Sequence, residues 1–159
     1  MTLAYNIIMG TIKLSREALH CNLDIIAQQV GARDKIAVVL KDNAYGHGAK
    51  MIEQEVQQYG IKQAVVRLES EALEIADFFE NILILADFPT APNTLFSYAI
   101  NTLDSIEKFP KGTRVELKID TGMHRHGLAS DELAKEFMGM AAHGLECIGV
   151  MSSVQSAVT

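Results

Sequence analysis

Six short runs of β-branched and aliphatic residues constrain the fold of this chain more than any other sequence feature. They cover residues 35–40, 63–67, 82–86, 97–101, 114–119 and 146–151. Each run is about as long as a typical β-strand. The runs KIAVVL and ILILA are almost continuously apolar, which is typical of strands covered on both faces. We therefore expect a parallel sheet with helices packed against it.

Stretches with helical periodicity lie between several of these strands. Helices are predicted over residues 15–29, 49–59 and 70–79, and from near Ser130 and Asp131 onward. Ser15 is a suitable N-cap for the first helix, and Gly31 and Gly60 follow the ends of the first two. Alternating strands and helices fit either an open doubly wound sheet or a (β/α) barrel, and the pattern alone does not choose between them.

The length and composition of the chain indicate one domain over residues 1–159. The chain is 48% hydrophobic, which is enough to bury a core, and no Pro-, Gly- or Ser-rich linker divides it. A complete eight-stranded barrel needs typically at least about 200 residues, and the sixth strand runs directly into the final MSSVQSAVT. We therefore expect a partial barrel that stops before closure.

The charge and hydropathy of the chain restrict its partners. A net charge of -6 argues against binding to nucleic acid or to anionic membrane surfaces. No apolar run of about 18 residues occurs, and the first ten residues do not have the pattern of a signal peptide. The sequence thus predicts a cytoplasmic protein that binds neither nucleic acid nor membranes.

Five residues of types that often bind ligands are interpreted as structural. Cys21 and Cys147 lack metal-ligand spacing, so we expect unpaired buried thiols and no metal site. His20 lies on a predicted helix without a second ligand at suitable spacing. Met138 and Met140 are expected to fill the core.

Chemistry-bearing residues follow two of the predicted strands, at the end where active sites of parallel folds lie. Lys41 comes directly after KIAVVL and opens the segment KDNAYGHG. An amine at the end of a buried strand can lose solvation, as an imine-forming nucleophile requires. The two glycines let the backbone approach a phosphate, together with a hydroxyl such as that of Tyr45. A solvated lysine in an ordinary glycine-rich loop is the alternative.

The second such segment is LKIDTGMHRHG, residues 117–127. Strand alternation sends Lys118 and Asp120 to the same side of the sheet. If that side faces a barrel interior, Arg125 is the cation that would orient an anionic oxygen there. From the residues alone, an exposed charged edge fits as well.

Both segments are similar to signature sequences of the alanine racemase family. VVLKDNAYGHG resembles the attachment signature for pyridoxal 5'-phosphate (PLP), VVKANAYGHG, and VELKIDTGMHRHG resembles the family's second block, LKIDTGMGRLG. Weaker similarity extends over residues 12–151. The resemblance implies a TIM-type (β/α) barrel, of which this chain carries about six parallel strands with their helices. It also implies PLP-dependent interconversion of L- and D-alanine, an isomerase activity that supplies D-alanine for peptidoglycan.

The resemblance also assigns roles to individual residues. Lys41 matches the catalytic lysine that carries PLP and exchanges the substrate's α-proton on one face. Tyr45 matches the tyrosine that binds the cofactor phosphate. Arg125 matches the arginine near the cofactor's phenolic oxygen and the substrate carboxylate. Lys118 matches a lysine that is carbamylated in many members and holds that arginine. Family members are homodimers in which a tyrosine of the partner's C-terminal β-domain is the second base.

Three positions depart from the family pattern. Asp42 stands where alanine is commonest and His124 where glycine is, and both changes are expected to be tolerated at a surface. Ser153 occupies the place of a histidine that stacks on the PLP ring. Because the C-terminal β-domain is also absent from these 159 residues, we expect the chain alone to be inactive.

Two other functions remain open. One is another PLP-dependent barrel enzyme, such as an amino-acid decarboxylase or a racemase for a different amino acid. The other is a PLP-binding homeostasis protein, which has a single barrel and no C-terminal domain. The AYGHG and KIDTGM segments favour alanine racemase over both.

Overall fold

The computed structural model describes residues 13–129 and 133–153 of the chain. Its centre is one six-stranded sheet in which every neighbouring pair of strands is parallel. The strands are β1 (Ala37–Val39), β2 (Gln63–Val66), β3 (Asn81–Ile84), β4 (Phe96–Ile100), β5 (Arg114–Ile119) and β6 (Glu146–Ser152). All six predicted strands are therefore confirmed, and so is their parallel pairing.

The helices described by the structure lie mostly between consecutive strands. They are α1 (Arg16–Val30), α2 (Lys41–Tyr45), α3 (Ala49–Tyr59), α4 (Glu69–Ile75) and α5 (Leu133–His143), with the 3-10 helices η1 (Arg33–Lys35), η2 (Ala76–Phe78) and η3 (Leu103–Lys108). The helix predicted to begin near Ser130 corresponds to α5, but its predicted start lies outside the described residues.

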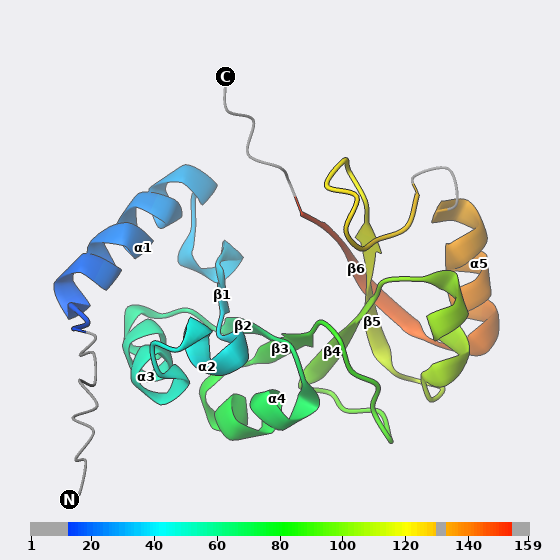
Figure 1. Ribbon diagram of the computed structural model, residues 1–159, viewed down its shortest axis with the longest axis horizontal. Helices are drawn as coiled ribbons and strands as arrows, with labels where there is room; N and C mark the ends of the chain where they lie inside the picture. Colours follow the sequence, from blue (N-terminus) through cyan, green and yellow to red (C-terminus); the bar gives the residue numbers. More distant parts are fainter. Residues whose placement is uncertain (1–12, 130–132, 154–159) are drawn as a thin grey trace, which may run out of the picture.

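The sheet follows the order of the chain, from β1 at one edge to β6 at the other. In Figure 1 the strands succeed one another in an arc, with α3 and α4 beneath β2 and β3 and with α5 beside β6. Among the described residues β1 and β6 each pair with one neighbour, so the arc is not closed. The fold is thus a partial (β/α) barrel, as predicted, and not a doubly wound sheet.

The ends of α1 and α3 follow from local sequence signals. The Ser15 hydroxyl accepts a hydrogen bond from the Ala18 N–H at 3.1 Å, which caps α1. Gly31, with φ of +87°, and Gly60, with φ of +99°, end α1 and α3 in the left-handed conformation that glycine adopts without strain. Both predicted helices are confirmed.

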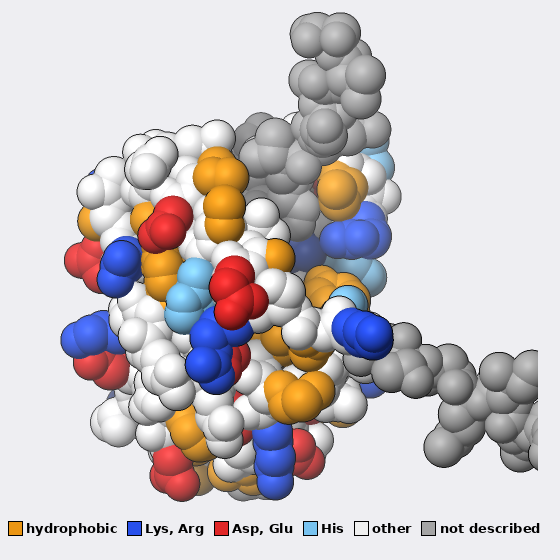
Figure 2. All heavy atoms as spheres, turned by 90° about the vertical axis from the view of Figure 1, so that its left-hand side faces the viewer, with side chains coloured by type: hydrophobic (Ala, Val, Ile, Leu, Met, Phe, Trp, Pro, Cys, Tyr) orange, Lys and Arg blue, Asp and Glu red, His pale blue; other side chains and the backbone are white. Residues whose placement is uncertain are grey.

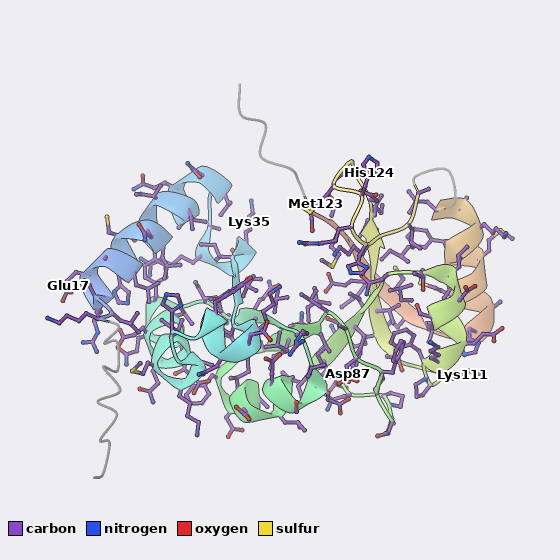
Figure 3. The ribbon with its side chains drawn as sticks, viewed as in Figure 1. Glu17, Lys35, Asp87, Lys111, Met123 and His124 are labelled. Carbon is purple, nitrogen blue, oxygen red and sulfur yellow. The ribbon has the colours of Figure 1, made fainter. Side chains whose placement is uncertain are left out.

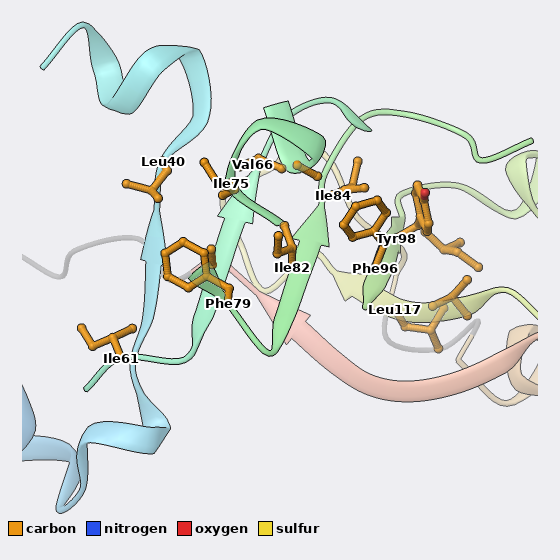
Figure 4. Close-up of a cluster of buried hydrophobic side chains, with 14 of the residues drawn as sticks. Leu40, Ile61, Val66, Ile75, Phe79, Ile82, Ile84, Phe96, Tyr98 and Leu117 are labelled. Atoms are coloured by element: carbon orange, nitrogen blue, oxygen red, sulfur yellow. The ribbon is translucent and has the colours of Figure 1, made fainter. Parts of the chain in front are cut away.

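The main hydrophobic core lies between the sheet and the helices that cover its outer face. Side chains from alternate strand positions, including those of Ile82, Ile84, Tyr98 and Leu117, are almost completely buried there (Figure 4). Leu83 points to the other face of the sheet and is also buried, at 7% exposure. Burial on both faces explains why β3 is continuously apolar in sequence. The same expectation is wrong for β1, where Ala37 and Val39 are exposed.

Two of the structural interpretations made from sequence are wrong. Met140 fills the core, but Met138 is 74% exposed, because residues two apart on a helix point in different directions. Cys21 and Cys147 are both free, as predicted, but neither is fully buried: Cys21 is exposed on α1 and Cys147 is half-buried. Figure 2 shows the side of the molecule formed by α1, where apolar side chains are interspersed with charged ones. In the described part of the chain no helix is long and apolar enough to cross a membrane.

Candidate active site

The carboxyl ends of the parallel strands bring the two sequence segments to the same edge of the sheet. Lys41 follows β1 directly, after the buried Leu40, and its own side chain is half-buried. Its Nζ lies 5.4 Å from the centre of the Tyr45 ring, which is itself 61% exposed. Lys118 lies near the end of β5. The structure therefore brings Lys41 and Tyr45 together, as predicted.

The segment after Lys41 has an uncommon backbone conformation. Asp42, Asn43, Ala44 and Tyr45 all have φ between +53° and +55°, so α2 is a left-handed turn. A non-glycine residue in this conformation costs about 1–2 kcal/mol. Such strain persists only where the surroundings determine the conformation, and it concentrates at functional sites.

Glu71, near the start of α4, is one of the surrounding residues that hold this turn in its conformation. Its Oε1 accepts the Asp42 N–H at 2.6 Å, while its Oε2 accepts the N–H groups of Arg67 at 2.8 Å and Leu68 at 3.0 Å. Partial burial acts to raise the pKa of Glu71, but the hydrogen bonds from Leu68, Asp42 and Arg67 outweigh it and hold this pKa below its usual value. Glu71 is thus an ionised acceptor at neutral pH.

Side chains of the lysine loop itself add two further contacts. The Arg67 guanidinium forms an ion pair with the Asp42 carboxylate at 2.9 Å. The Asn43 Oδ1 accepts the Ala49 N–H at 2.8 Å, which joins the turn to the start of α3. The departure from the family pattern at Asp42 therefore adds an ion pair between this loop and the end of β2.

The loop after β5 is organised around Asp120. Its Oδ1 accepts the N–H groups of Gly122 and His124, both at 3.0 Å, and its Oδ2 lies 3.1 Å from the His124 Nδ1. The hydrogen bonds from the His124 and Gly122 N–H groups lower the pKa of Asp120. His124 itself has φ of +51° and lies at the tip of the loop with Met123 (Figure 3). The Asp120 contacts support this backbone conformation.

The same loop closes by returning to the end of β5. The Leu128 N–H bonds to the Lys118 carbonyl at 2.8 Å, and the Asp120 N–H bonds to the Leu128 carbonyl at 3.0 Å. Gly127 packs against this backbone so tightly that an added Cβ would lie 2.6 Å from the Asp120 nitrogen. Arg125 is therefore carried on a loop that is fixed at both ends.

Lys118 is a buried cation with cationic neighbours. Its side chain is 8% exposed, so the exposed charged edge is excluded for this residue. Burial, and then the positive charges of Arg125 and Lys41, lower its pKa, while Asp120 acts in the opposite direction. Within the described residues, Lys41, Lys118 and Arg125 form no ion pair. Lys41 and Arg125 thus lie near enough to Lys118 for their charges to act on it.

This donor set fits PLP. The cofactor carries a phosphate and a phenolic oxygen, both anionic, and cations that form no ion pair within the described residues suit such groups. An amine at the edge of the sheet suits its aldehyde. Ser152 and Ser153 follow at the end of β6, where the Thr121 Oγ1 lies 3.0 Å from the Ser152 Oγ and donates to the Ser153 carbonyl at 3.4 Å. Ser153 has no ring to stack on a cofactor.

Sequence reasoning missed how the two loops are held: it did not single out Glu71, and it named Asp120 without its hydrogen bonds to the loop backbone. Glu71 occupies the third position of α4 and its carboxylate accepts the N-cap N–H, a common capping arrangement. Its additional bond to Asp42 joins residues 29 positions apart and has no sequence signal. Asp120 had a signal, because aspartate followed by Thr-Gly is a typical turn sequence in which the side chain binds the backbone two residues on.

Comparisons with known proteins identify a family. The family model "Alanine racemase, N-terminal domain" matches residues 14–158. The chain is 48% identical over 149 residues to an alanine racemase of a Nitratiruptor species, covering 94% of this chain and 44% of that protein. It is 47% identical over 142 residues to an alanine racemase of Campylobacter concisus, and the alignment covers 89% of this chain and 42% of that protein. The chain spans less than half the length of these relatives.

Solved structures agree with the fold. An alanine racemase from Corynebacterium glutamicum superposes with a TM-score of 0.74 at 25% identity, covering 91% of this chain and 46% of that chain. A histidine racemase from Leuconostoc mesenteroides superposes with a TM-score of 0.78 at 24% identity, and the superposition covers 91% of this chain and 43% of that chain. The shared fold therefore accompanies racemases named for different amino acids.

Proposed function

Because this chain belongs to the family of alanine racemase N-terminal domains, we propose that it forms the PLP-binding part of an enzyme that interconverts L- and D-alanine. The observation that carries the proposal is that Lys41 and Lys118 both lie at the carboxyl ends of strands of one parallel sheet, with the charges of Lys41 and Arg125 acting on the buried Lys118. An amine beside two further cations is suited to an anionic cofactor with an aldehyde. Alanine is favoured as substrate by the two relatives with nearly half of their aligned residues identical.

Each site residue has a proposed task. PLP, when bound, withdraws electrons from the α-carbon of an amino acid and so acidifies its α-proton. Lys41 holds the cofactor, and its Nζ takes up and returns that proton on one face. The Tyr45 hydroxyl binds the phosphate. The Arg125 guanidinium orients the phenolic oxygen and the substrate carboxylate.

We propose that Lys118 supports Arg125 as a carbamate. Its lowered pKa increases the fraction of unprotonated amine, which adds to carbon dioxide and releases a proton. The product is an anion in place of a cation beside Arg125, so repulsion becomes attraction.

The remaining proposals concern the complete protein. They are a homodimer in which the partner subunit supplies the second base, a cytoplasmic location, and D-alanine for peptidoglycan as the product. The proposed domain is residues 1–159, part of a PLP-binding barrel. Truncating general acid–base partners typically costs about 10²–10⁴ in rate, so we expect no D-alanine above a PLP-only control from these residues alone. The complete protein should convert alanine in preference to serine, lysine or histidine.

Attachment of the cofactor is the direct test. The purified protein is incubated with PLP and reduced with borohydride, and its peptides are mapped. We expect the pyridoxyl group on Lys41 and its loss in Lys41→Ala. Labelling chiefly at Lys50 or Lys118 would show that the lysine is wrongly assigned.

A further inference from the structure

The backbone on either side of Lys41 is fixed by the neighbouring βα unit. Before it, the Leu40 N–H donates to the Val65 carbonyl of β2 at 2.8 Å. After it, the Asp42 N–H donates to the Glu71 Oε1 of α4 at 2.6 Å. Lys41 thus lies between two hydrogen bonds to β2 and α4, and both bonds cross from one βα unit to the next.

The two bonds differ in what they need. The bond to Val65 belongs to the ladder between β1 and β2 and would form with many side chains at these positions. The bond to Glu71 forms where the chain leaves the strand and enters the left-handed turn. A carboxylate acceptor makes shorter and stronger hydrogen bonds than a neutral one. Glu71 is therefore placed to offset the strain of the turn at the residue directly after the lysine.

The two carboxylate oxygens of Glu71 contact different parts of the structure. At the start of α4, Oε2 alone accepts the N–H groups of Arg67 and Leu68, while the Asp87 carboxylate accepts the Glu69 N–H at 3.0 Å. Oε1 is directed to another loop and contributes nothing to capping α4. A residue that served α4 alone would not need this second contact.

We propose that Glu71 is a positioning residue for Lys41: by holding the Asp42 N–H it sets the direction in which the lysine side chain leaves the backbone. This inference rests on the proposed function of Lys41 as the cofactor-bearing residue. The lysine Nζ must reach one atom of a bound cofactor, and small errors in geometry at such a site are costly in rate.

Glu71→Gln separates the two tasks of the side chain. An amide offers one carbonyl oxygen and one NH2 group. If the carbonyl oxygen keeps the two N–H groups of Arg67 and Leu68, the NH2 group faces the Asp42 N–H and cannot accept from it. Amide hydrogen exchange at Asp42, followed by NMR, measures the strength of the hydrogen bond from Asp42 to Glu71 without any cofactor. Timed borohydride trapping with PLP reports how fast Lys41 forms its imine. Glu74→Gln is the matched control, since Glu74 is exposed on the same helix and carries the same charge.

We expect Glu71→Gln to speed exchange of the Asp42 amide at least about tenfold, as loss of a hydrogen bond to a charged group implies, with the amides of β3 unchanged. Pyridoxyl labelling of Lys41 should slow by a similar factor, and Glu74→Gln should match the parent protein in both. If Glu71→Gln does not fold, Glu71→Asp takes its place, because it keeps a charge near the start of α4 but is one methylene too short to reach Asp42.

The results separate the inference from the function on which it rests. Unchanged exchange at Asp42, or equal acceleration of all strand amides, would overturn the role of Glu71. Faster exchange at Asp42 with unchanged labelling of Lys41 would also overturn the role of Glu71, because its hydrogen bond to Asp42 would then not position the lysine. Absence of label on Lys41 in the parent protein would refute the proposed function, and the exchange of the Asp42 amide would still decide whether Glu71 holds the loop.

Discussion

The loop after β1 is held by side chains from a neighbouring βα unit, whereas the loop after β5 is closed mainly by its own residues and contacts the end of β6 through Thr121. Glu71 and Arg67 reach the first loop from α4 and from the end of β2. Asp120 and the return to Leu128 close the second loop on itself. The first loop contains four consecutive left-handed residues, and the second contains a single non-glycine residue of this kind, His124, among its described residues. Hydrogen bonds from a charged side chain outside the loop are thus found where the backbone strain is greater.

Gly127→Ala should have the largest effect on this comparison. An added Cβ would lie 2.6 Å from the Asp120 nitrogen and 2.8 Å from the Ile119 carbonyl carbon, and φ is +128°. Both neighbouring atoms are backbone, so the end of β5 must move. We expect the free energy of unfolding, measured by chemical denaturation, to fall by about 3 kcal/mol.

Gly46→Ala is the matched change in the first loop. Its φ is +83°, but nothing lies within 4 Å of an added Cβ. Only the conformational cost of about 1 kcal/mol is expected. Similar losses for the two variants would mean that tight backbone packing does not distinguish the second loop.

In protein whose Lys118 is not carbamylated, Lys118→Met should be stabilising by about 1 kcal/mol, because a buried cation near Arg125 and Lys41 is replaced by an apolar side chain of similar size. The pKa of Lys118 is lowered in the folded state. The penalty for its charge is therefore full below the folded pKa and disappears as the pH rises to the ordinary lysine value. The gain, measured by denaturation at several pH values, should shrink accordingly.

Lys62→Met provides the contrast for that variant. Lys62 is exposed, and its ion pair with Glu80 raises its pKa. A small loss of stability is expected there. A loss for Lys118→Met as well would contradict the view that the cations are unfavourably gathered at the site.

Asp120→Asn should loosen the second loop and leave the first unchanged. Because hydrogen bonds from the His124 and Gly122 N–H groups lower the pKa of Asp120, its contribution is complete above the ordinary aspartate pKa and is lost as the pH falls through the folded value. Protection of the Gly122 and His124 amides, corrected for intrinsic exchange, should therefore decline in acid below about pH 4. The asparagine variant should show weaker protection at neutral pH and no such decline.

The first loop provides the internal control in that experiment. Protection of the Asp42 amide should be the same in Asp120→Asn as in the parent protein. A persistent acid decline at Gly122 in the variant would assign the titration to another group.

Arg67→Gln should have the smallest effect. Arg67 and Asp42 form an ion pair of which both side chains are about half exposed, and such pairs contribute about 0.5 kcal/mol or less. The change should vanish at high salt. A loss above about 1 kcal/mol would mean that this ion pair, and not Glu71, holds the first loop.

The fold was predictable because its signals are local. β-branched runs located the six strands, and Gly60 marked the end of α3. The connection between β3 and β4 has no helix, which agrees with Pro89 and Pro92 in that segment. The lysine and arginine segments were found by their position after two predicted strands, and their roles were assigned by resemblance to family signatures.

The support of the site was not predictable, because it depends on contacts between distant residues. Ala44 and Tyr45 have no preference for the left-handed conformation, so their sequence gives no indication of the turn. That conformation is stabilised through Glu71, whose position on α4 suggests only a helix cap. Asp120 acts within a few residues and was accessible to a local argument.

Because the strands pair in chain order, the two loops can form at different times during synthesis. Each strand pairs with the next one along the chain, so the sheet can grow as the polypeptide leaves the ribosome. Glu71 follows Lys41 closely, whereas Leu128 closes the second loop 57 residues after Glu71. At about 5–20 residues per second, the lysine loop can form roughly 3–11 s before the arginine loop. The nascent protein would then present the lysine before the arginine that is proposed to orient its substrate.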